Sequence, residues 1–239
     1  IKPGTTTRQI DNIVDQFISD AGAIPLFKGV RGVVPFPAAT CTSVNEEVVH
    51  GIPGNRVLEE GDIISIDIGV KLNGWCADAA TTYAVGNISR EKQDLLRVTE
   101  ETLSLAIRLL STETKWSEIA RQMQAYAEEE GYHVIRQLIG HGIGQSIHEP
   151  PQVPNFYSRH NRDFDIKPGL VIAVEPMLSV GTHKIVTLDD HWTVTSADKS
   201  PSAHFEHTIA ITDEGPKILT ADSSGNGWAI PDELAQTLN

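Results

Sequence analysis

The chain has 239 residues, of which 40% are hydrophobic and 21% charged, and these averages exclude a disordered or fibrous chain. Its formal net charge is -13 at pH 7, and no run of Lys or Arg provides the basic surface that a nucleic acid requires. We therefore expect no direct nucleic-acid partner. No apolar run approaches the ~18 residues of a membrane span, so we expect no membrane partner either.

The first half of the chain predicts a helix followed by a β-hairpin. The helix lies between a cap at Thr5 or Thr6 and Gly22. Residues 61–70 and 75–85 alternate apolar and polar side chains, and an Asn-Gly pair lies between them, which is the strongest short-range hairpin signal. The apolar positions with helical spacing are Ile10, Ile13, Val14, Phe17 and Ile18.

The remainder predicts two more helices, from about Ser89 and from about Ser117, and then strands at residues 170–178 and 203–212. Gly131 stands where the left-handed cap of the third helix belongs. This order predicts an α+β fold, with helices packed on the outer face of a curved antiparallel sheet. No linker is present, so we expect residues 1–239 to form a single domain.

The predicted hairpin carries two carboxylates. If the Asn-Gly pair forms a two-residue loop, Gly69 pairs with Asp78, and Asp67 and Asp78 become diagonal neighbours with backbones about 7–8 Å apart. One interpretation is an ordinary solvated face. However, Asp67 stands between two isoleucines in a very apolar stretch, where aspartate is disfavoured. A bound cation is the interpretation that resolves this conflict.

Two further carboxylates occur in the later strands. Glu175 ends an apolar run and precedes Pro176, which cannot continue a central strand. Glu206 precedes the apolar run at residues 208–211. Either residue alone is more often found on a surface or in a turn, but four carboxylates on apolar strands are harder to explain in that way.

Two histidines follow the third predicted helix. Glycines around His141 deprive that segment of helix and allow another group to approach its backbone closely. His148 precedes Glu149-Pro150-Pro151. A lone histidine is more often a hydrogen-bonded core or surface residue, and neither matches HExxH, which excludes a helical zinc site.

Convergence of the four carboxylates would require neutralisation. At ~4 Å and an effective dielectric of ~20, each like-charge pair costs about 4 kcal/mol, so several pairs exceed the stability of a typical domain. Two divalent cations balance four negative charges. Oxygen-rich ligation with one imidazole suits Mn, Fe, Co or Zn. Such a pair can activate water and polarise a carbonyl group.

An ordered set of residues resembles that of the type I methionine aminopeptidases, metallopeptidases of the pita-bread fold. The resemblance extends from Lys2 to about Thr212 and includes the flanking segments 41–46, 50–53, 140–150, 172–177 and 192–194. Type II relatives carry a helical insertion, for which the segment between His148 and Glu175 leaves no room. The set consists of His50, Asp67, Asp78, His141, His148, Glu175 and Glu206.

The resemblance implies an aminopeptidase that removes the initiator methionine from nascent polypeptides when the second residue is small. It implies that Asp78 and Glu206 bridge two metal ions and that Glu175 also accepts the proton of the attacking water. It implies that His148 hydrogen-bonds the scissile carbonyl and His50 the scissile amide nitrogen. The implied metal ligands are Asp67, Asp78, His141, Glu175 and Glu206.

The resemblance also implies a substrate pocket, whose residues include His50 and His148. Tyrosine is usual in the family where Val33 and Phe36 stand, so we expect a pocket of different shape. We also expect the family's opening helix to be missing from this chain. The residues that match the methionine pocket are Val33, Phe36, Cys41, Ile147 and Trp192.

Two alternatives remain open at this stage. Aminopeptidase P and prolidase have a similar set of five metal ligands, but they generally carry a large N-terminal domain. Non-catalytic pita-bread modules bind peptides, but have typically lost ligands. For location, two cysteines without a CxxC motif fit a reducing cytoplasm. We expect a monomer that acts on the N-terminal peptides of nascent chains, with the ribosome as an open question.

Overall fold

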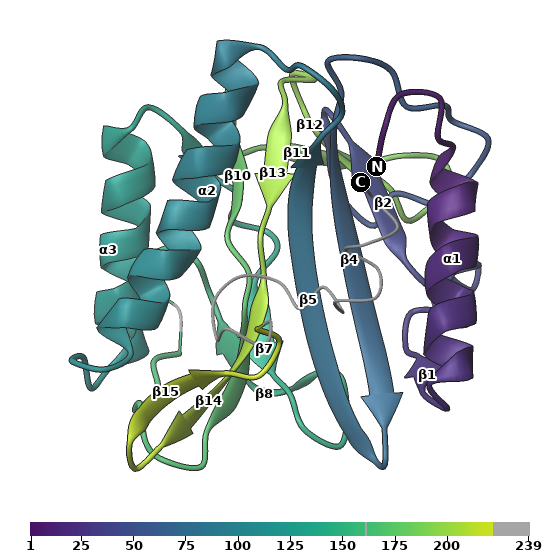
Figure 1. Ribbon diagram of the computed structural model, residues 1–239. Helices are drawn as coiled ribbons and strands as arrows, with labels where there is room; N and C mark the ends of the chain where they lie inside the picture. The colour runs from purple at the N-terminus through teal and green to yellow at the C-terminus, as the bar shows by residue number, and fades with distance from the viewer. Residues whose placement is uncertain (161, 222–239) are drawn as a thin grey trace.

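The computed structural model describes residues 1–160 and 162–221. Its helices are α1 (Thr7–Asp20), α2 (Arg90–Leu109) and α3 (Trp116–Glu129). Figure 1 shows α2 and α3 side by side on one flank of the strands and α1 on the other. The predicted domain extends to residue 239, so its last part lies outside the described residues. In the described part, no helix is both long and apolar enough to cross a membrane.

Three of the helix ends lie at the residues that the sequence predicted, whereas α3 begins at Trp116 after Lys115, which makes no side-chain cap. The Thr6 hydroxyl accepts a hydrogen bond from the Gln9 N–H at 3.2 Å, and the Gln9 side chain accepts one from the Thr6 N–H at 2.8 Å. This reciprocal pair is a capping box. The Ser89 hydroxyl caps α2 by accepting from the Lys92 N–H. After α3, Gly131 adopts φ +89°, as a left-handed cap requires.

The strands form four antiparallel sheets in the described part of the chain. Their order is β1-β4-β2 with β5 paired to β4, then β13-β10-β6, β11-β12-β3 and β15-β14-β9-β7-β8. The predicted α+β class with antiparallel pairing is therefore confirmed, although the sheet is divided into four. The bounds are β1 (Ile24–Pro25), β2 (Cys41–Val44), β3 (Glu47–Val49), β4 (Ile63–Leu72), β5 (Trp75–Ala84), β6 (His133–Val134), β7 (Gly140–Gly142), β8 (Glu149–Val153), β9 (Val171–Val174), β10 (Met177–Ser179), β11 (Ile185–Thr187), β12 (Val194–Ser196), β13 (Ser202–His204), β14 (His207–Thr212) and β15 (Gly215–Ile218).

The β4–β5 hairpin has the expected register. Asn73 and Gly74 form its two-residue loop with φ of +50° and +88°, and two positive values are what a type I′ turn requires. Gly69 pairs with Asp78 across the hairpin, so Asp67 and Asp78 are diagonal neighbours, as predicted. Both carboxylates are buried, so this sheet face is not solvated.

Each of the two later predicted strands is broken at its carboxylate. The strand predicted at 170–178 is β9 and β10, separated by Glu175-Pro176, and that at 203–212 is β13 and β14, separated by Phe205-Glu206. Both breaks mark a change of sheet, because β9 pairs with β14 whereas β10 pairs with β13. At the second break, the Glu206 N–H donates to the Ala80 carbonyl on β5 at 2.8 Å.

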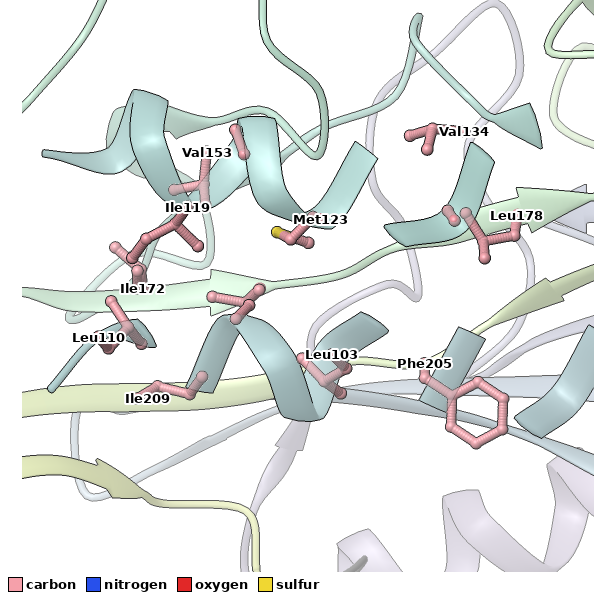
Figure 2. Packing of buried hydrophobic residues seen from close by; sticks show 14 of the residues in the cluster. Leu103, Leu110, Ile119, Met123, Val134, Val153, Ile172, Leu178, Phe205 and Ile209 are labelled. Atoms are coloured by element: carbon pink, nitrogen blue, oxygen red, sulfur yellow. The ribbon is translucent and has the colours of Figure 1, made fainter. Parts of the chain in front are cut away.

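The largest core cluster lies between the helix pair α2–α3 and the strands. Figure 2 shows Leu103 of α2, Met123 of α3 and Ile172 of β9 together in this cluster. Helix α1 differs from the prediction: the side chains of Ile13 and Phe17 are 62% and 51% exposed. On that helix Thr7, Ile10 and Ile18 are buried, so the face that packs inward is narrower than the apolar face.

Candidate metal centre

Hydroxyl groups fix the backbone around the carboxylates. The Thr208 hydroxyl donates to the Asp78 carbonyl at 2.8 Å and accepts from the Asp78 N–H at 2.9 Å. The Thr82 hydroxyl bonds the His204 carbonyl and N–H in the same way, both at 2.9 Å. These contacts hold β5 against the β13–β14 segment, which places Asp78 and Glu206 together.

Five predicted ligands converge where β5 meets the β13–β14 segment. Asp78, His141 and Glu206 each offer a ligand atom, and these three atoms lie within 4.8 Å of one another. His141 Nε2 lies 3.8 Å from Asp78 Oδ2 and 3.7 Å from Glu175 Oε1. Asp67 is the diagonal neighbour of Asp78 across the β4–β5 ladder, and both residues line the same cavity. The hairpin, β7 and the two strand breaks therefore contribute to a single cluster.

Burial dominates the electrostatics of this cluster. It raises the pKa of Asp78 to about 7. Burial, and then the charge of Asp78, raises the pKa values of Asp67, Glu175 and Glu206 well above the usual range. The pKa of His141 is lowered, first by burial. Without a cation, the carboxyl groups therefore retain protons at pH values where exposed ones are ionised.

The donor set fits a divalent metal ion. Among the described residues, Asp67 Oδ1, Asp78 Oδ1 and Glu206 Oε1 are buried oxygens without a hydrogen-bond partner. Buried polar atoms are normally paired, so these three require an explanation. Carboxylate oxygens beside one imidazole suit hard or borderline cations, and a cation would use the free oxygens as ligands.

The cluster lines a cavity of about 1240 Å³ that His50 and His148 also line. The rings of His148 and His141 meet edge to face with centroids 4.4 Å apart. Burial lowers the pKa of His50 to about 4, and it also lowers the pKa of His148. Both imidazoles are therefore neutral at pH 7 and can each donate one hydrogen bond.

The backbone at His50 adopts a conformation that is uncommon for residues other than glycine. Its φ is +58°, in the left-handed region. The neighbouring Gly51 donates to the Ser43 hydroxyl, and its carbonyl accepts from the Thr42 N–H at 2.8 Å. These bonds hold the loop and keep the imidazole of His50 in the cavity.

An apolar pocket forms another part of the cavity. Phe36, Cys41, Ile147 and Trp192, which the family resemblance implied for the substrate pocket, line it. The rings of Phe36 and Trp192 pack edge to face at 5.3 Å. Phe36 and Cys41 are 3% exposed, so this wall is packed from behind.

Val33 does not belong to this pocket, and the prediction that it would line the pocket is wrong. Its side chain is 78% exposed and does not line the cavity. Trp192 reaches the same loop through its indole N–H, which donates to the Val34 carbonyl at 2.9 Å. Phe27 lines the cavity beside Ile147 and was not predicted. No periodicity or motif marks Phe27 in the sequence.

His204 was also missed. It lies on β13 and lines the cavity, with 2% of its surface exposed. Its Nε2 atom is 3.7 Å from Glu175 Oε2 and 3.9 Å from Glu206 Oε2. Its position two residues before Glu206 was the available signal, because alternate residues of an extended chain share a face.

Comparisons with known proteins agree with this geometry. The sequence matches metallopeptidase family M24 over residues 1–213. Methionine aminopeptidase 1 of Bacillus subtilis is 51% identical over 220 residues, which cover 92% of this chain and 87% of that protein.

Solved structures give the same picture. The crystal structure of a methionine aminopeptidase from Thermotoga maritima has a TM-score of 0.88 at 40% identity, covering 93% of this chain and 88% of that one. A prolidase from Pyrococcus furiosus has a TM-score of 0.71 at 22% identity, covering 93% of this chain and 58% of that one. The second likeness concerns the fold alone.

Proposed function

The chain belongs to metallopeptidase family M24, and from that premise we propose that it is a pita-bread methionine aminopeptidase. It hydrolyses the bond after the N-terminal methionine of new polypeptides whose second residue is small. The observation that carries this proposal is the meeting of four carboxylates and His141 beside an apolar pocket in one cavity. A prolidase-like activity is less favoured, because the likeness to prolidase is limited to the fold.

The five residues of the cluster would hold the divalent metal ions, and Asp78 and Glu206 would serve both ions of a pair. Two ions match the four carboxylates in charge, and the unpartnered oxygens of Asp67, Asp78 and Glu206 support this count. Bound divalent ions would activate the attacking water and polarise the scissile carbonyl. The donor types suit Mn, Fe, Co or Zn. The ligands are Asp67, Asp78, His141, Glu175 and Glu206.

Three side chains would perform the remaining steps. Glu175 accepts the proton of the attacking water at its carboxylate. His148 donates a hydrogen bond to the scissile carbonyl oxygen as negative charge develops there, and His50 hydrogen-bonds the scissile amide nitrogen. The lowered pKa values of both histidines keep them neutral, so neither repels the ammonium group of an arriving N-terminus.

The methionine side chain would occupy the apolar pocket. An unbranched thioether packs well against aromatic edges and sulfur, which Phe36, Trp192 and Cys41 provide together with Ile147. The substrates would be the N-termini of nascent chains, so we infer that the enzyme acts in the cytoplasm. We also propose that it acts as a monomer. Whether it docks on the ribosome is a separate question that binding to ribosomes would answer.

A peptide panel tests this proposal. Purified protein supplied with Mn²⁺ or Co²⁺ should release methionine from Met-Ala-Ser, cleave Met-Ala and Met-Ser peptides well and Leu-Ala peptides poorly, and leave Met-Leu and Met-Lys peptides nearly intact. Chelation of the metal should abolish cleavage. Rapid cleavage of Met-Lys, or a preference for proline in second place whatever the first residue, would refute the proposal.

A further inference from the structure

The imidazole of His204 is buried beside the metal centre without a hydrogen-bond partner. Neither Nδ1 nor Nε2 has one among the described residues. The side chain is 2% exposed, so solvent does not satisfy these atoms. Buried polar atoms are nearly always paired, and those that are not tend to serve a function.

The backbone of His204 is fixed, so the position of its ring is not a matter of chance. The Thr82 hydroxyl donates to the His204 carbonyl and accepts from the His204 N–H. Because its single proton is used there, the 2.9 Å contact between Thr82 and the Ser65 hydroxyl has Ser65 as the donor. On the other side, His204 pairs with Met177 of β10.

Two carboxylates face the ring. Nε2 lies 3.7 Å from Glu175 Oε2 and 3.9 Å from Glu206 Oε2, which is longer than a hydrogen bond. Hydrogen bonds in catalytic sites are often long before the substrate binds and shorten in the Michaelis or transition-state complex. The Glu175 backbone is already held, because Asn155 Nδ2 donates to its carbonyl at 3.0 Å. Only the Glu175 carboxylate remains to be oriented.

We propose that His204 is a positioning residue that donates its Nε2–H to the carboxylate of Glu175 and so aims that carboxylate at the metal centre. This inference rests on the proposed ligand set. Carboxylate ligands of metals are usually hydrogen-bonded in turn, and the loss of such a partner typically costs 10–100-fold in metal affinity. The ring makes no hydrogen bond within the described residues, so its replacement by an apolar side chain should not weaken the fold.

Three substitutions separate these roles. His204→Leu removes the donor and keeps an apolar group of useful size. His204→Gln places an amide N–H near the position of Nε2, whereas His204→Asn places one near Nδ1. His133→Leu is the control for loss of a surface imidazole, because His133 on β6 is exposed and does not line the cavity.

The measurement is the Mn²⁺ affinity of each protein. Each protein is first freed of metal and then titrated with Mn²⁺ alone, and binding is monitored by calorimetry and by the Mn²⁺ spin-resonance signal. We expect His204→Leu and His204→Asn to bind Mn²⁺ about 10–100-fold more weakly than the wild type. We expect His204→Gln and His133→Leu to bind within about 3-fold of it, following the same reasoning. The melting temperature of metal-free His204→Leu should equal or exceed that of the wild type.

Several results would overturn the role of His204. Unchanged Mn²⁺ affinity in His204→Leu would do so, as would weak binding by His204→Gln, since a donor at Nε2 would then not be the cause. A fall in the metal-free melting temperature of His204→Leu that accounts for the lost affinity would indicate a structural role instead. Failure of the wild type to bind Mn²⁺ would overturn both this proposal and the proposed ligands, whereas the other results leave the ligands in place.

Discussion

The two halves of the metal centre are built in opposite ways. Asp67 and Asp78 lie within the long, continuous β4 and β5 strands, where the ladder and the Asn73-Gly74 turn fix their register. Glu175 and Glu206 lie where strands stop and the chain passes from one sheet to another. Local sequence therefore builds the hairpin half, whereas contacts between distant segments build the other half. A complete site forms only when both are in place.

The largest expected effect comes from two single variants, each of which removes one carboxylate from a different half of the centre. Asp78→Ala and Glu206→Ala should both lose bound metal and reduce kcat/KM by more than the ~100-fold that follows loss of a ligand's hydrogen-bond partner. Both should remain folded, because each removes a buried acid with an unpartnered oxygen. Metal analysis, steady-state kinetics and far-UV circular dichroism measure these outcomes.

The control for this pair is Asp213→Ala, which removes an exposed carboxylate outside the cavity. It should keep full metal content and activity. Full metal occupancy in Asp78→Ala or in Glu206→Ala would show that the corresponding half of the centre does not hold the ions. The comparison between the halves would then fail.

The second prediction concerns pH and the metal-free protein. Burial raises the pKa of Asp78 from 3.8 to about 7 in the folded state. Between these values the folded state binds more protons than the unfolded state, so the free energy of unfolding falls as pH rises from about 4 to 7. Asp78 alone would contribute on the order of 4 kcal/mol to this fall.

Added Mn²⁺ should reverse the trend, because metal ligands bind in their deprotonated form. Denaturant titrations of metal-free protein at several pH values provide the measurement, with Asp78→Asn as the matched variant. The slope of stability against pH should be shallower in Asp78→Asn. An equal slope in the two proteins would mean that this carboxyl group ionises normally.

The same division explains what the sequence could predict. The hairpin register and the pairing of Gly69 with Asp78 follow from an Asn-Gly pair and an alternating pattern, which are local properties. The strand breaks were not predicted in full: Pro176 announced one, but nothing local marks the break at Phe205-Glu206. That break depends on the hydrogen bond from Glu206 to Ala80, far away in the chain.

Side-chain direction was harder to predict than element type. Ile13 and Phe17 fit a helical apolar face, yet they are exposed, because burial depends on what packs against α1. Val33 is likewise exposed, whereas Phe36, three residues later, is buried and lines the cavity. The predicted histidines stand in sequence motifs, whereas the only sequence signal for His204 was its position two residues before Glu206.

The third prediction sharpens the comparison with a residue that belongs to neither half. His50→Asn should keep metal content and lower turnover by about 10²-fold, as the loss of a transition-state donor does. Asparagine is the suitable substitution because it tolerates the φ of +58° at this position. His50→Ala should lose the same turnover and, in addition, some stability. Unchanged turnover in His50→Asn would leave His50 a loop residue only.

The smallest effect tests whether the hairpin half truly depends on local geometry. Gly74 has φ +88° in the turn and no atom within 4 Å of an added Cβ, so Gly74→Ala costs backbone strain alone. We expect the free energy of unfolding to fall by about 1–2 kcal/mol, which lowers the melting temperature by roughly 2–8 °C. The matched control is Gly54→Ala, where φ is not positive and the nearest atom to an added Cβ is 3.8 Å away. That change should be neutral or slightly stabilising.

Metal affinity should not change in either variant, because the ladder between β4 and β5 is long enough to hold Asp67 and Asp78 when the turn is strained. A metal affinity that falls with Gly74→Ala but not with Gly54→Ala would show that the turn itself, more than the ladder, sets the position of these carboxylates.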